Sequence, residues 1–374
     1  MIRPLTIGLR YKHQDAWVGG VYYVRNLVNA LGLLPTDQRP RLVIIGGDQQ
    51  ALDDLRQATG YPDLRRLSRA RIERSGDGEE IALILMGSPP GLEDRGVQWV
   101  PDFQEHRFPQ FFDQAELTSR YQHNTERFAR HSHVMVSSQD VASDFRRFYP
   151  ASQARAHVVR FASFVPVNLP DPRARYGLPE RYFLCANQLW KHKNHPLILR
   201  ALAEAPEAAP VAFTGREEDY RDLSYAPSVR ALAAELGVED RVHFLGFLPR
   251  ADQLGLMQHA AAVIQPSLCE GWSTVIEDAK ALGVPVLASD IAVHREQLPA
   301  GADFFDPQDP TALAALLTRY AKADPPPLEL DYGAAKLRFA HDLWQMITDI
   351  EADFRNRGVA RLTIHRPSPL EGEG

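Results

Sequence analysis

The chain has 374 residues, a net charge of −6, and a composition of 44% hydrophobic and 24% charged residues. Because this length exceeds that of one ordinary domain, it predicts two. The acidic balance excludes the basic field that drives nucleic-acid binding, so no nucleic-acid partner is expected. Neither Cys185 nor Cys269 has a disulfide or metal-ligand spacing, which is typical of a reduced, cytoplasmic compartment.

Short apolar runs alternate with stretches of helical period along the whole chain. This is the pattern of parallel sheets with crossover helices, so the predicted fold class is α/β. In the first half, the expected strands are Leu5–Leu9, Arg41–Ile45, Ile81–Met86, Val97–Val100 and Val134–Ser137, and the expected helices lie near Val21–Leu33, Phe112–Arg130 and Gln139–Phe148.

The stretch between His157 and Arg175 carries three prolines and no helical period, which indicates a crossing between domains. A second complete array follows, with expected strands at Tyr182–Ala186, Val211–Thr214, Val242–Leu245, Ala262–Gln265 and Val284–Ala288. We therefore expect an N-terminal domain at residues 1–165, a second domain at 174–333, a long helix with an apolar stripe at 334–358, and a disordered tail at 359–374.

The most informative segment begins where the strand at 262–265 ends. Glu270 lies in a loop, and Ser273 or Thr274 is placed to cap a helix that stops at Gly283. In an open α/β sheet, ligands bind beyond the carboxyl ends of the strands, where a helix N-terminus attracts an anion. A diphosphate suits this position. Asp278 shares a helix face with Thr274, one turn below the phosphates, and could reach ribose hydroxyls.

The run Glu270-Gly271-Trp272, followed by an acid eight residues after Glu270, resembles the paired-acid signature of the retaining glycosyltransferases of family 4. The chain departs from that signature because the second acid is Asp278 rather than Glu, with Glu277 beside it, and either could serve. The resemblance implies the GT-B fold, in which two Rossmann-like doubly wound domains face each other across a cleft and the C-terminal helix crosses back to the N-terminal domain.

The resemblance also implies roles for single residues on the donor side. Glu270 would contact the transferred sugar, Asp278 would hold the ribose, and the backbone of Trp272–Val275 would contact sugar or phosphate. Many relatives have an Arg where Gln188 stands and a Lys at position 193, which together resemble a cationic clamp on the donor phosphates. Since Gln188 removes one charge, Lys191 or Lys193 must stabilise more of the leaving diphosphate.

Two further strand ends fit the same family pattern. The run Phe213-Thr214-Gly215 places Thr214 toward the donor by resemblance, and the run Leu245-Gly246-Phe247-Leu248 supplies Phe247 and Leu248 as contacts of the nucleobase. Ordinary core packing is the alternative for this second pair.

On the acceptor side, the pair Gly19 and Gly20 between a strand and a helix resembles the first loop of the family. Such a pair lets the backbone approach a phosphate or sugar closely, although a simple tight turn explains it equally. The segment at 102–107 resembles the one that supplies a sugar-contacting His in relatives. The usual position aligns with Glu105, so His106, one residue on, is the expected third catalytic residue beside Glu270 and Lys193.

No metal and no cofactor are expected, because the chain carries no Asp-X-Asp sequence of the kind that holds a metal in the other large glycosyltransferase architecture. The nucleotide-diphosphate sugar would be a co-substrate. No apolar run approaches the roughly 20 residues of a membrane span, so membrane contact would be peripheral, at the inner face of the plasma membrane. The arginine-rich stretch Leu64–Arg74 could supply it, with a solvated helix face as the alternative.

As a function, the resemblance implies retaining transfer of a hexose, for which mannose is one candidate, to a glycan or lipid-linked acceptor. The destination would be a bacterial surface polysaccharide, such as the O-antigen of lipopolysaccharide or an exopolysaccharide. Two alternatives stay open: a non-catalytic nucleotide-sugar-binding scaffold subunit, which Gln188 and Asp278 favour, and another GT-B enzyme such as a sugar-nucleotide 2-epimerase. The sequence does not name the base, the acceptor or the oligomeric state.

Overall fold

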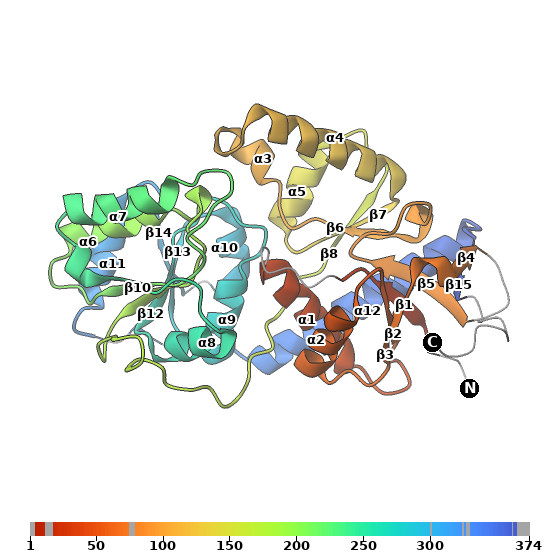
Figure 1. The fold of residues 1–374 in the computed structure, drawn as a ribbon, viewed down its shortest axis with the longest axis horizontal. Coiled ribbons are helices and arrows are strands. Elements are labelled where there is room, and N and C mark those ends of the chain that lie inside the picture. Colours follow the sequence, from red (N-terminus) through yellow and green to blue (C-terminus); the bar gives the residue numbers. More distant parts are fainter. Residues whose placement is uncertain are drawn as a thin grey trace. The chain divides into compact units, whose positions relative to one another are not determined.

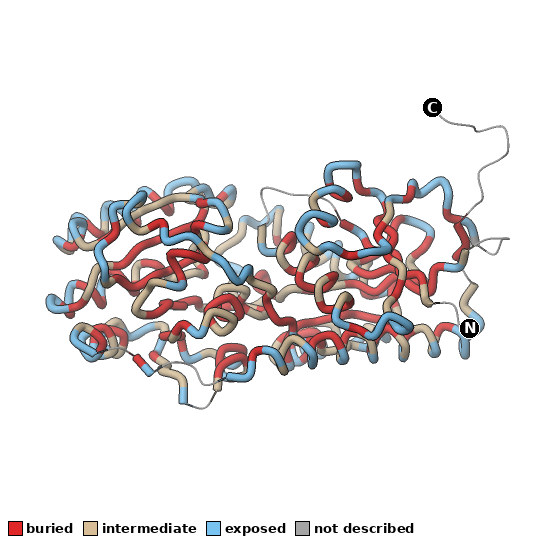
Figure 2. The backbone as a smooth tube through the Cα atoms, turned by 90° about the horizontal axis from the view of Figure 1, so that it is seen from below, coloured by how far each residue is buried: buried red, intermediate tan, exposed pale blue. Residues whose placement is uncertain are grey.

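The computed structural model describes residues 4–11, 18–74, 79–299, 301–323, 325–326, 330–360 and 362–364. The chain forms two compact units (Figure 1). Unit 1 comprises Met1–Asp102, Ser119–Ala162 and Gly333–Gly374. Unit 2 comprises Phe103–Thr118 and Ser163–Tyr332. In both units, buried strands are enclosed by helices whose outer faces are exposed (Figure 2).

Unit 1 is built mainly from parallel strands and crossover helices. Its elements, including two helices that extend over the unit boundary, are β1 (Thr6–Leu9), α1 (Val18–Gly32), β2 (Arg41–Ile45), α2 (Gln49–Thr59), β3 (Leu64–Leu67), η1 (Arg69–Arg71), β4 (Ile72–Arg74), β5 (Glu79–Leu85), η2 (Glu93–Arg95), β6 (Val97–Trp99), α4 (Gln114–Arg130), β7 (His133–Val136), α5 (Gln139–Phe148), β8 (Arg155–Val158), α12 (Tyr332–Asn356) and β15 (Leu362–Ile364).

Two sheets carry the strands of unit 1. The larger has the order β3-β2-β1-β5-β15-β4, in which β15 runs antiparallel to β4 and β5 while β1, β2, β3 and β5 are parallel. The smaller is the parallel sheet β6-β7-β8. The arginine-rich stretch lies in β3, η1 and β4, so its expected helix face is wrong.

The tail from residue 359 was expected to be disordered, and for Leu362–Ile364 this is wrong. Leu362 and Ile364 alternate with Thr363, and both apolar side chains are buried in one core cluster with Ile72 and Ile81 of the neighbouring strands. Their burial outweighs the entropy of ordering a short strand. The remainder of the tail, at 365–374, lies outside the described residues.

The long C-terminal helix is α12, and it belongs to unit 1 from Gly333 onward, so the expected return of this helix to the first part of the chain is confirmed. Its buried stripe has helical spacing and consists of Phe339, Leu343, Met346, Ile347, Ile350 and Phe354. Leu337, an apolar residue near the start of the same helix, is 59% exposed and is not part of this buried stripe.

Unit 2 repeats the alternation of strand and helix (Figure 1). Its elements are α3 (Gln104–Arg107), η3 (Pro109–Phe111), β9 (Phe183–Cys185), η4 (Lys191–Lys193), α6 (His195–Glu204), β10 (Val211–Phe213), α7 (Tyr225–Glu235), η5 (Glu239–Arg241), β11 (Val242–Phe244), α8 (Arg250–His259), β12 (Ala262–Gln265), α9 (Thr274–Leu282), β13 (Val286–Ser289), α10 (Ala292–Gln297), β14 (Asp303–Phe305) and α11 (Pro310–Arg319).

The sheet of unit 2 is parallel throughout and has the order β11-β10-β9-β12-β13-β14. Since β9 is the first strand of unit 2 along the chain and β12 is its fourth, the strand order reverses between these two neighbours. This is the topological switch point of a doubly wound sheet, where the crevice outside the strand ends receives a ligand.

Both faces of this sheet are covered, which explains why its strands read as continuous apolar runs. Phe183 and Cys185 of β9 join the core cluster under α6, α7 and α11, whereas Leu184 between them joins the cluster under α8 and α9. The predicted α/β, Rossmann-like character of this half is therefore confirmed.

Candidate active site

The polar residues of unit 2 gather at the carboxyl ends of β9 and β12, on both sides of the switch point. Asn187 follows β9, Gln265 ends β12, and the two side chains are joined by a hydrogen bond of 2.9 Å from Asn187 Nδ2 to Gln265 Oε1. The loop after β10 is drawn close to the same edge. A Cβ on Gly215, whose φ is +133°, would lie 2.4 Å from the Asn187 carbonyl oxygen, so only glycine fits there.

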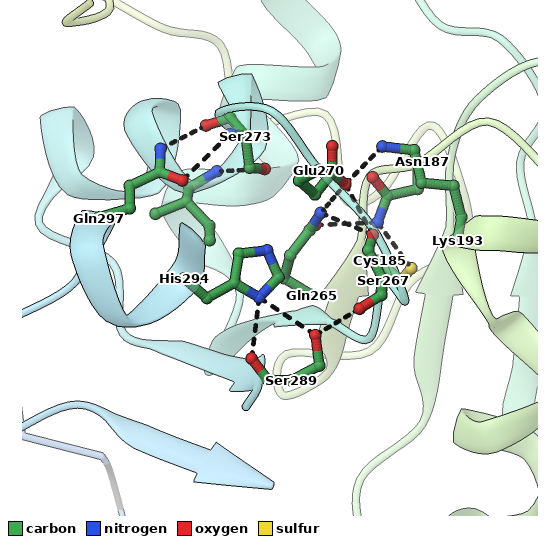
Figure 3. Close-up of polar contacts among 11 residues, drawn as sticks. Cys185, Asn187, Lys193, Gln265, Ser267, Glu270, Ser273, Ser289, His294 and Gln297 are labelled. Carbon is green, nitrogen blue, oxygen red and sulfur yellow. Dashed lines mark hydrogen bonds and ion pairs between the residues drawn. The ribbon is translucent and has the colours of Figure 1, made fainter. Parts of the chain in front are cut away.

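Glu270 is the centre of this polar group (Figure 3). Its Oε1 accepts hydrogen bonds from Lys193 Nζ at 2.6 Å, Gln265 Nε2 at 2.8 Å and Ser267 Oγ at 2.7 Å. All three donors act on one oxygen, and the other, Oε2, points away from them. The structure thus brings together Lys193 and Glu270, two of the three predicted catalytic residues.

The charge state of Glu270 follows from its surroundings. Burial raises the pKa of its carboxyl group, but the Lys193 ammonium and the Ser267 hydroxyl outweigh that effect and hold the pKa below its usual value. The side chains of Lys193 and Glu270 are 16% and 11% exposed. The site therefore holds an ionised carboxylate beside an ammonium group, both largely removed from water.

A buried imidazole lies next to this pair. His294 Nδ1 is 2.9 Å from the Ser289 carbonyl oxygen, which requires a proton on Nδ1 and leaves Nε2 as an acceptor. Burial lowers the pKa of His294 to about 4, so the ring is neutral near pH 7. Among the described residues, Nε2 has no hydrogen-bond partner.

The expected start and end of the helix after Glu270 are confirmed. Ser273 is the N-cap of α9 and its Oγ accepts from the Ile276 amide, while Gly283 ends the helix in a left-handed conformation. Gln297 holds the cap by accepting from the Ser273 amide and donating to its carbonyl. Because Ser273 lies three residues after Glu270, the first-turn amides of Thr274 and Val275 begin beside the carboxylate loop.

The two candidate second acids are both buried, but they have different partners. Glu277 accepts hydrogen bonds from Lys280, Gln297 and Tyr332 at 2.7, 3.0 and 2.6 Å. Asp278 forms an ion pair of 2.6 Å with Arg250, the first residue of α8. Glu277 is thus bound into the packing of its own unit, and Asp278 is paired with a side chain that is 25% exposed.

The remaining donor-side residues are less closely grouped. Phe247 is 50% exposed and has the Arg216 guanidinium 4.5 Å from its ring centre, whereas Leu248 is buried in the core. The placement of Leu248 favours the core-packing alternative for that residue. Thr214 is fully buried and lies 3.5 Å from the Gln253 amide nitrogen.

Two residues of the predicted donor site lie in partly exposed positions. The side chain of Gln188 is half-buried after β9. Trp272 is also half-buried, and its ring has the Lys280 ammonium 5.9 Å from its centre.

The acceptor-side residues differ from their expected setting. Gly19 and Gly20 were expected between a strand and a helix, but they lie inside the first turn of α1, because the helix already begins at Val18. The part of that loop at 12–17 lies outside the described residues. His106 is half-buried in α3, where its ring packs against Phe103 at 6.2 Å, and burial lowers its pKa.

Sequence reasoning missed several polar residues of this site. Gln265 is the clearest, since a polar residue at the end of an otherwise apolar strand would have marked it. Arg250 could have been found as a cation at the start of a helix. The residues that carried no such signal are Asn187, Ser267, Ser289, His294 and Gln297. In the described part of the chain, no three His, Cys, Asp or Glu side chains are grouped to hold a metal ion.

No helix among the described residues is long and apolar enough to cross a membrane. Residues 173–337 match the family model described as "Glycosyl transferases group 1". The chain is 28% identical over 181 residues to the O-antigen chain mannosyltransferase RfbU of Salmonella typhimurium, which covers 48% of each protein. The chain spans about half the length of the curated relatives it matches, at 48%, 58% and 53% of the first three.

Solved structures match over almost the whole chain. Sucrose-phosphate synthase from Thermosynechococcus elongatus has a TM-score of 0.62 and 16% identity, covering 95% of this chain and 98% of that one. Anabaena Alr3699/HepE, solved in complex with UDP and glucose, has a TM-score of 0.61 and 16% identity, covering 94% and 99%. At this level of identity the similarity shows the fold, and the predicted GT-B fold is confirmed.

Proposed function

Because residues 173–337 match the family model of the group 1 glycosyl transferases, we propose that the protein is a retaining glycosyltransferase whose donor, a nucleotide-diphosphate sugar, binds at the switch point of unit 2. The observation that carries the proposal is the contact of 2.6 Å between Lys193 and Glu270 beside the N-terminus of α9. It combines an ammonium group for a diphosphate with a carboxylate for sugar hydroxyls. These are also the two residues to which the resemblance to the family signature assigns those roles.

The electrostatic contribution of the chain falls on the leaving diphosphate. In this proposal, Lys193 and the free amides in the first turn of α9 bind the phosphate oxygens, where negative charge grows as the glycosidic bond breaks. Gln188 supplies no charge, so Lys193 is the principal cation of the clamp. These groups stabilise the diphosphate without a metal ion, and we propose that none is needed.

Glu270 orients the transferred sugar through Oε2, the oxygen that its protein donors leave open. Its lowered pKa keeps it ionised, so it accepts hydrogen bonds from hydroxyl groups and does not act as an acid. The acceptor oxygen would attack from the face that the diphosphate leaves, with retention at the anomeric carbon, and its proton would pass to an oxygen of the departing diphosphate. His106 and the pair Gly19 and Gly20 stay candidates for the acceptor side of this reaction.

For the nucleoside, we propose Asp278 as the ribose-binding acid and the exposed ring of Phe247 as the contact of the base. The transferred group is a hexose. Mannose is favoured by the name of the O-antigen chain mannosyltransferase, and glucose by the ligands of the Anabaena structure. The resemblance to the O-antigen chain mannosyltransferase supports an acceptor in bacterial surface polysaccharide synthesis, either a glycan or a lipid-linked sugar. Binding at a membrane surface would be peripheral.

The test is calorimetric titration of the purified protein with UDP, GDP, ADP and dTDP, followed by the matching sugar nucleotides. We expect one base to bind selectively. Lys193→Ala should weaken the nucleoside diphosphate by about tenfold or more, since it removes a charged partner of the phosphates. Lys322→Ala is the matched control because Lys322 also pairs with a glutamate of unit 2, Glu207, but at an exposed position.

Three results would count against the proposal. Absence of binding by every nucleotide would remove the donor site from unit 2. Binding without turnover of any sugar nucleotide, even with extracted lipid-linked acceptors, would instead favour the scaffold subunit. Turnover to an epimerised sugar nucleotide would identify a 2-epimerase.

A further inference from the structure

We propose that Gln265 is a positioning residue for the reaction, a role that rests on the proposed function of Glu270 in binding the donor sugar. Gln265 is fully buried at the end of β12. Of the three donors to Glu270 Oε1, it is the one that belongs to a strand of the sheet, and its amide carries no charge. The inference is that this amide sets the rotamer of Glu270 and directs Oε2 at the sugar.

The orientation of the Gln265 amide is fixed from its other end. Asn187 Nδ2 donates to Gln265 Oε1 at 2.9 Å, so the Gln265 NH₂ group must face Glu270 and Ser267. An inverted amide would place an oxygen against the carboxylate and an NH₂ group against Asn187, which are two repulsive contacts. Asn187 follows β9 and Gln265 ends β12, so this relay spans the switch point of the sheet (Figure 3).

A second anchor holds the same loop. Ser267 donates to Glu270 Oε1 at 2.7 Å, and its own carbonyl oxygen accepts from Ser289 Oγ at 2.6 Å. Three of the residues involved, Gln265, Ser267 and Ser289, are fully buried. Their rotamers are therefore fixed by packing, in contrast to the partly exposed Lys193.

This arrangement separates two tasks at Glu270. In the structure, Lys193 contacts the carboxylate at 2.6 Å, whereas the proposed reaction requires its charge on the diphosphate. When the diphosphate draws Lys193 away, Gln265 and Ser267 still hold Oε1 in place. The sugar then meets a carboxylate that is already oriented, which avoids the cost of ordering it during the reaction.

The experiment uses UDP with UDP-glucose, or GDP with GDP-mannose, according to which base the wild type binds. Gln265→Leu should weaken the sugar nucleotide by about 10- to 100-fold, the range for losing one hydrogen bond to a charged group. It should change the affinity for the nucleoside diphosphate by less than about twofold, because that ligand does not contact Glu270. Asn187→Leu should show the same selective loss.

A further variant gives a readout that a purely structural role would not move. In Gln265→Glu, the new carboxylate still accepts from Asn187 but repels Glu270 while both are ionised. As the pH falls from 8 to 5, the pair takes up one proton, and the neutral acid becomes a donor to Oε1. Affinity for the sugar nucleotide should therefore recover toward that of the wild type at low pH, whereas the affinity for the diphosphate should follow the wild type throughout.

The control is Gln98→Leu, which removes a buried amide of unit 1 that contacts His131 and Arg127. It should leave both affinities unchanged. Equal weakening of both ligands in Gln265→Leu and Asn187→Leu, or a flat pH profile in Gln265→Glu, would overturn the inference while the proposed function stands. If Gln265→Leu does not fold, the pH profile of Gln265→Glu decides. Failure of the wild type to bind any nucleotide would remove the proposed function itself.

Discussion

At the scale of single residues, unit 2 shows how partners decide which of two adjacent acids is available to a ligand. Glu277 has three donors, Lys280, Gln297 and Tyr332, and both of its oxygens are engaged. Asp278 has an ion pair with Arg250 through one oxygen. Because Gln297 also binds the cap of α9, Glu277 is tied to the structure of the helix start, and its removal should be felt as lost stability.

We therefore expect Asp278→Asn and Glu277→Gln to have opposite signatures. Asp278→Asn should weaken nucleoside diphosphate binding by about tenfold, since it removes a charged acceptor for ribose hydroxyls. Glu277→Gln should lower the free energy of unfolding by about 2 kcal/mol, because its partner Lys280, whose side chain is only 11% exposed, is left without a countercharge. Calorimetric titration and urea unfolding of both variants measure the two effects.

A loss of affinity in Glu277→Gln that exceeds the loss in Asp278→Asn would assign the ribose to Glu277 instead. A useful control is Asp290→Asn, because the side chain of Asp290 forms an exposed ion pair with Arg295 and, in the described part of the chain, does not pair with Asp278 or Glu277. That variant should change neither affinity nor stability appreciably.

At the scale of elements, α12 is fastened to unit 1 by a short chain of titratable groups. His133 on β7 contacts His157 on β8 at 3.0 Å and Asp353 on α12 at 2.9 Å, and its ring packs edge to face on Phe354. Asp353 also pairs with Arg357 at 2.8 Å. One imidazole must donate and the other accept in the contact between the histidines, so the arrangement requires that the rings are not both protonated.

This chain of contacts predicts a loss of stability in acid. Burial, with the nearby charge of His133, lowers the pKa of His157 to about 4, below the roughly 6.5 of an unfolded histidine. The folded state then binds fewer protons than the unfolded state, so the stabilisation is complete above about pH 6.5 and is lost as the pH falls toward 4. Between pH 7 and pH 5, the titration of His157 should lower the free energy of unfolding by about 2 kcal/mol.

Urea unfolding of the wild type and His157→Gln at both pH values measures this contribution. Glutamine can still hydrogen-bond to His133 but does not titrate, so the variant should lose about 2 kcal/mol less than the wild type on acidification. His341→Gln on α12 is the control, since the side chain of His341 is 77% exposed. An identical acid response in the wild type and His157→Gln would show that His157 does not set it.

At the scale of the whole molecule, the sequence predicted the elements that local pattern specifies. It did not predict the elements and contacts that depend on pairing between distant parts of the chain. Buried parallel strands such as 262–265 are nearly continuous apolar runs, and the helix at 274–282 carries its own cap and stop residues, so both could be predicted. The strand Leu362–Ile364 could not, because its three residues gain their stability only by pairing with β4 and β5, which lie far away in the sequence.

The candidate site divides in the same way. Glu270 and Lys193 were predicted because a family signature marks them. The relay from Asn187 through Gln265 was not, because it depends on β9 and β12 becoming neighbours, which is a property of strand order and not of local pattern. Leu248 shows the converse, since it was predicted as a base contact together with Phe247 but its side chain is buried in the core.

The division of the chain into two units yields a prediction about where a donor is felt. The groups proposed to bind the nucleotide diphosphate, Lys193, the first turn of α9 and Asp278, all belong to unit 2. Loop amides exchange with solvent through local fluctuations, so a bound ligand should slow exchange where it contacts them. Hydrogen exchange followed by mass spectrometry, with and without the nucleoside diphosphate, should therefore show protection in peptides covering 187–195, 246–250 and 266–278.

Peptides from β1, β2 and β5 of unit 1 should exchange at the same rate in both samples. Their exchange depends on the stability of the core of unit 1, and the proposed donor site lies in unit 2. The segment at 18–32 tests whether Gly19 and Gly20 contact the donor diphosphate or the acceptor. Protection there as strong as at 266–278 would place Gly19 and Gly20 on the diphosphate, whereas its absence with the nucleotide alone would leave that glycine pair to the acceptor. Protection confined to unit 1 would contradict a donor site at the switch point of unit 2.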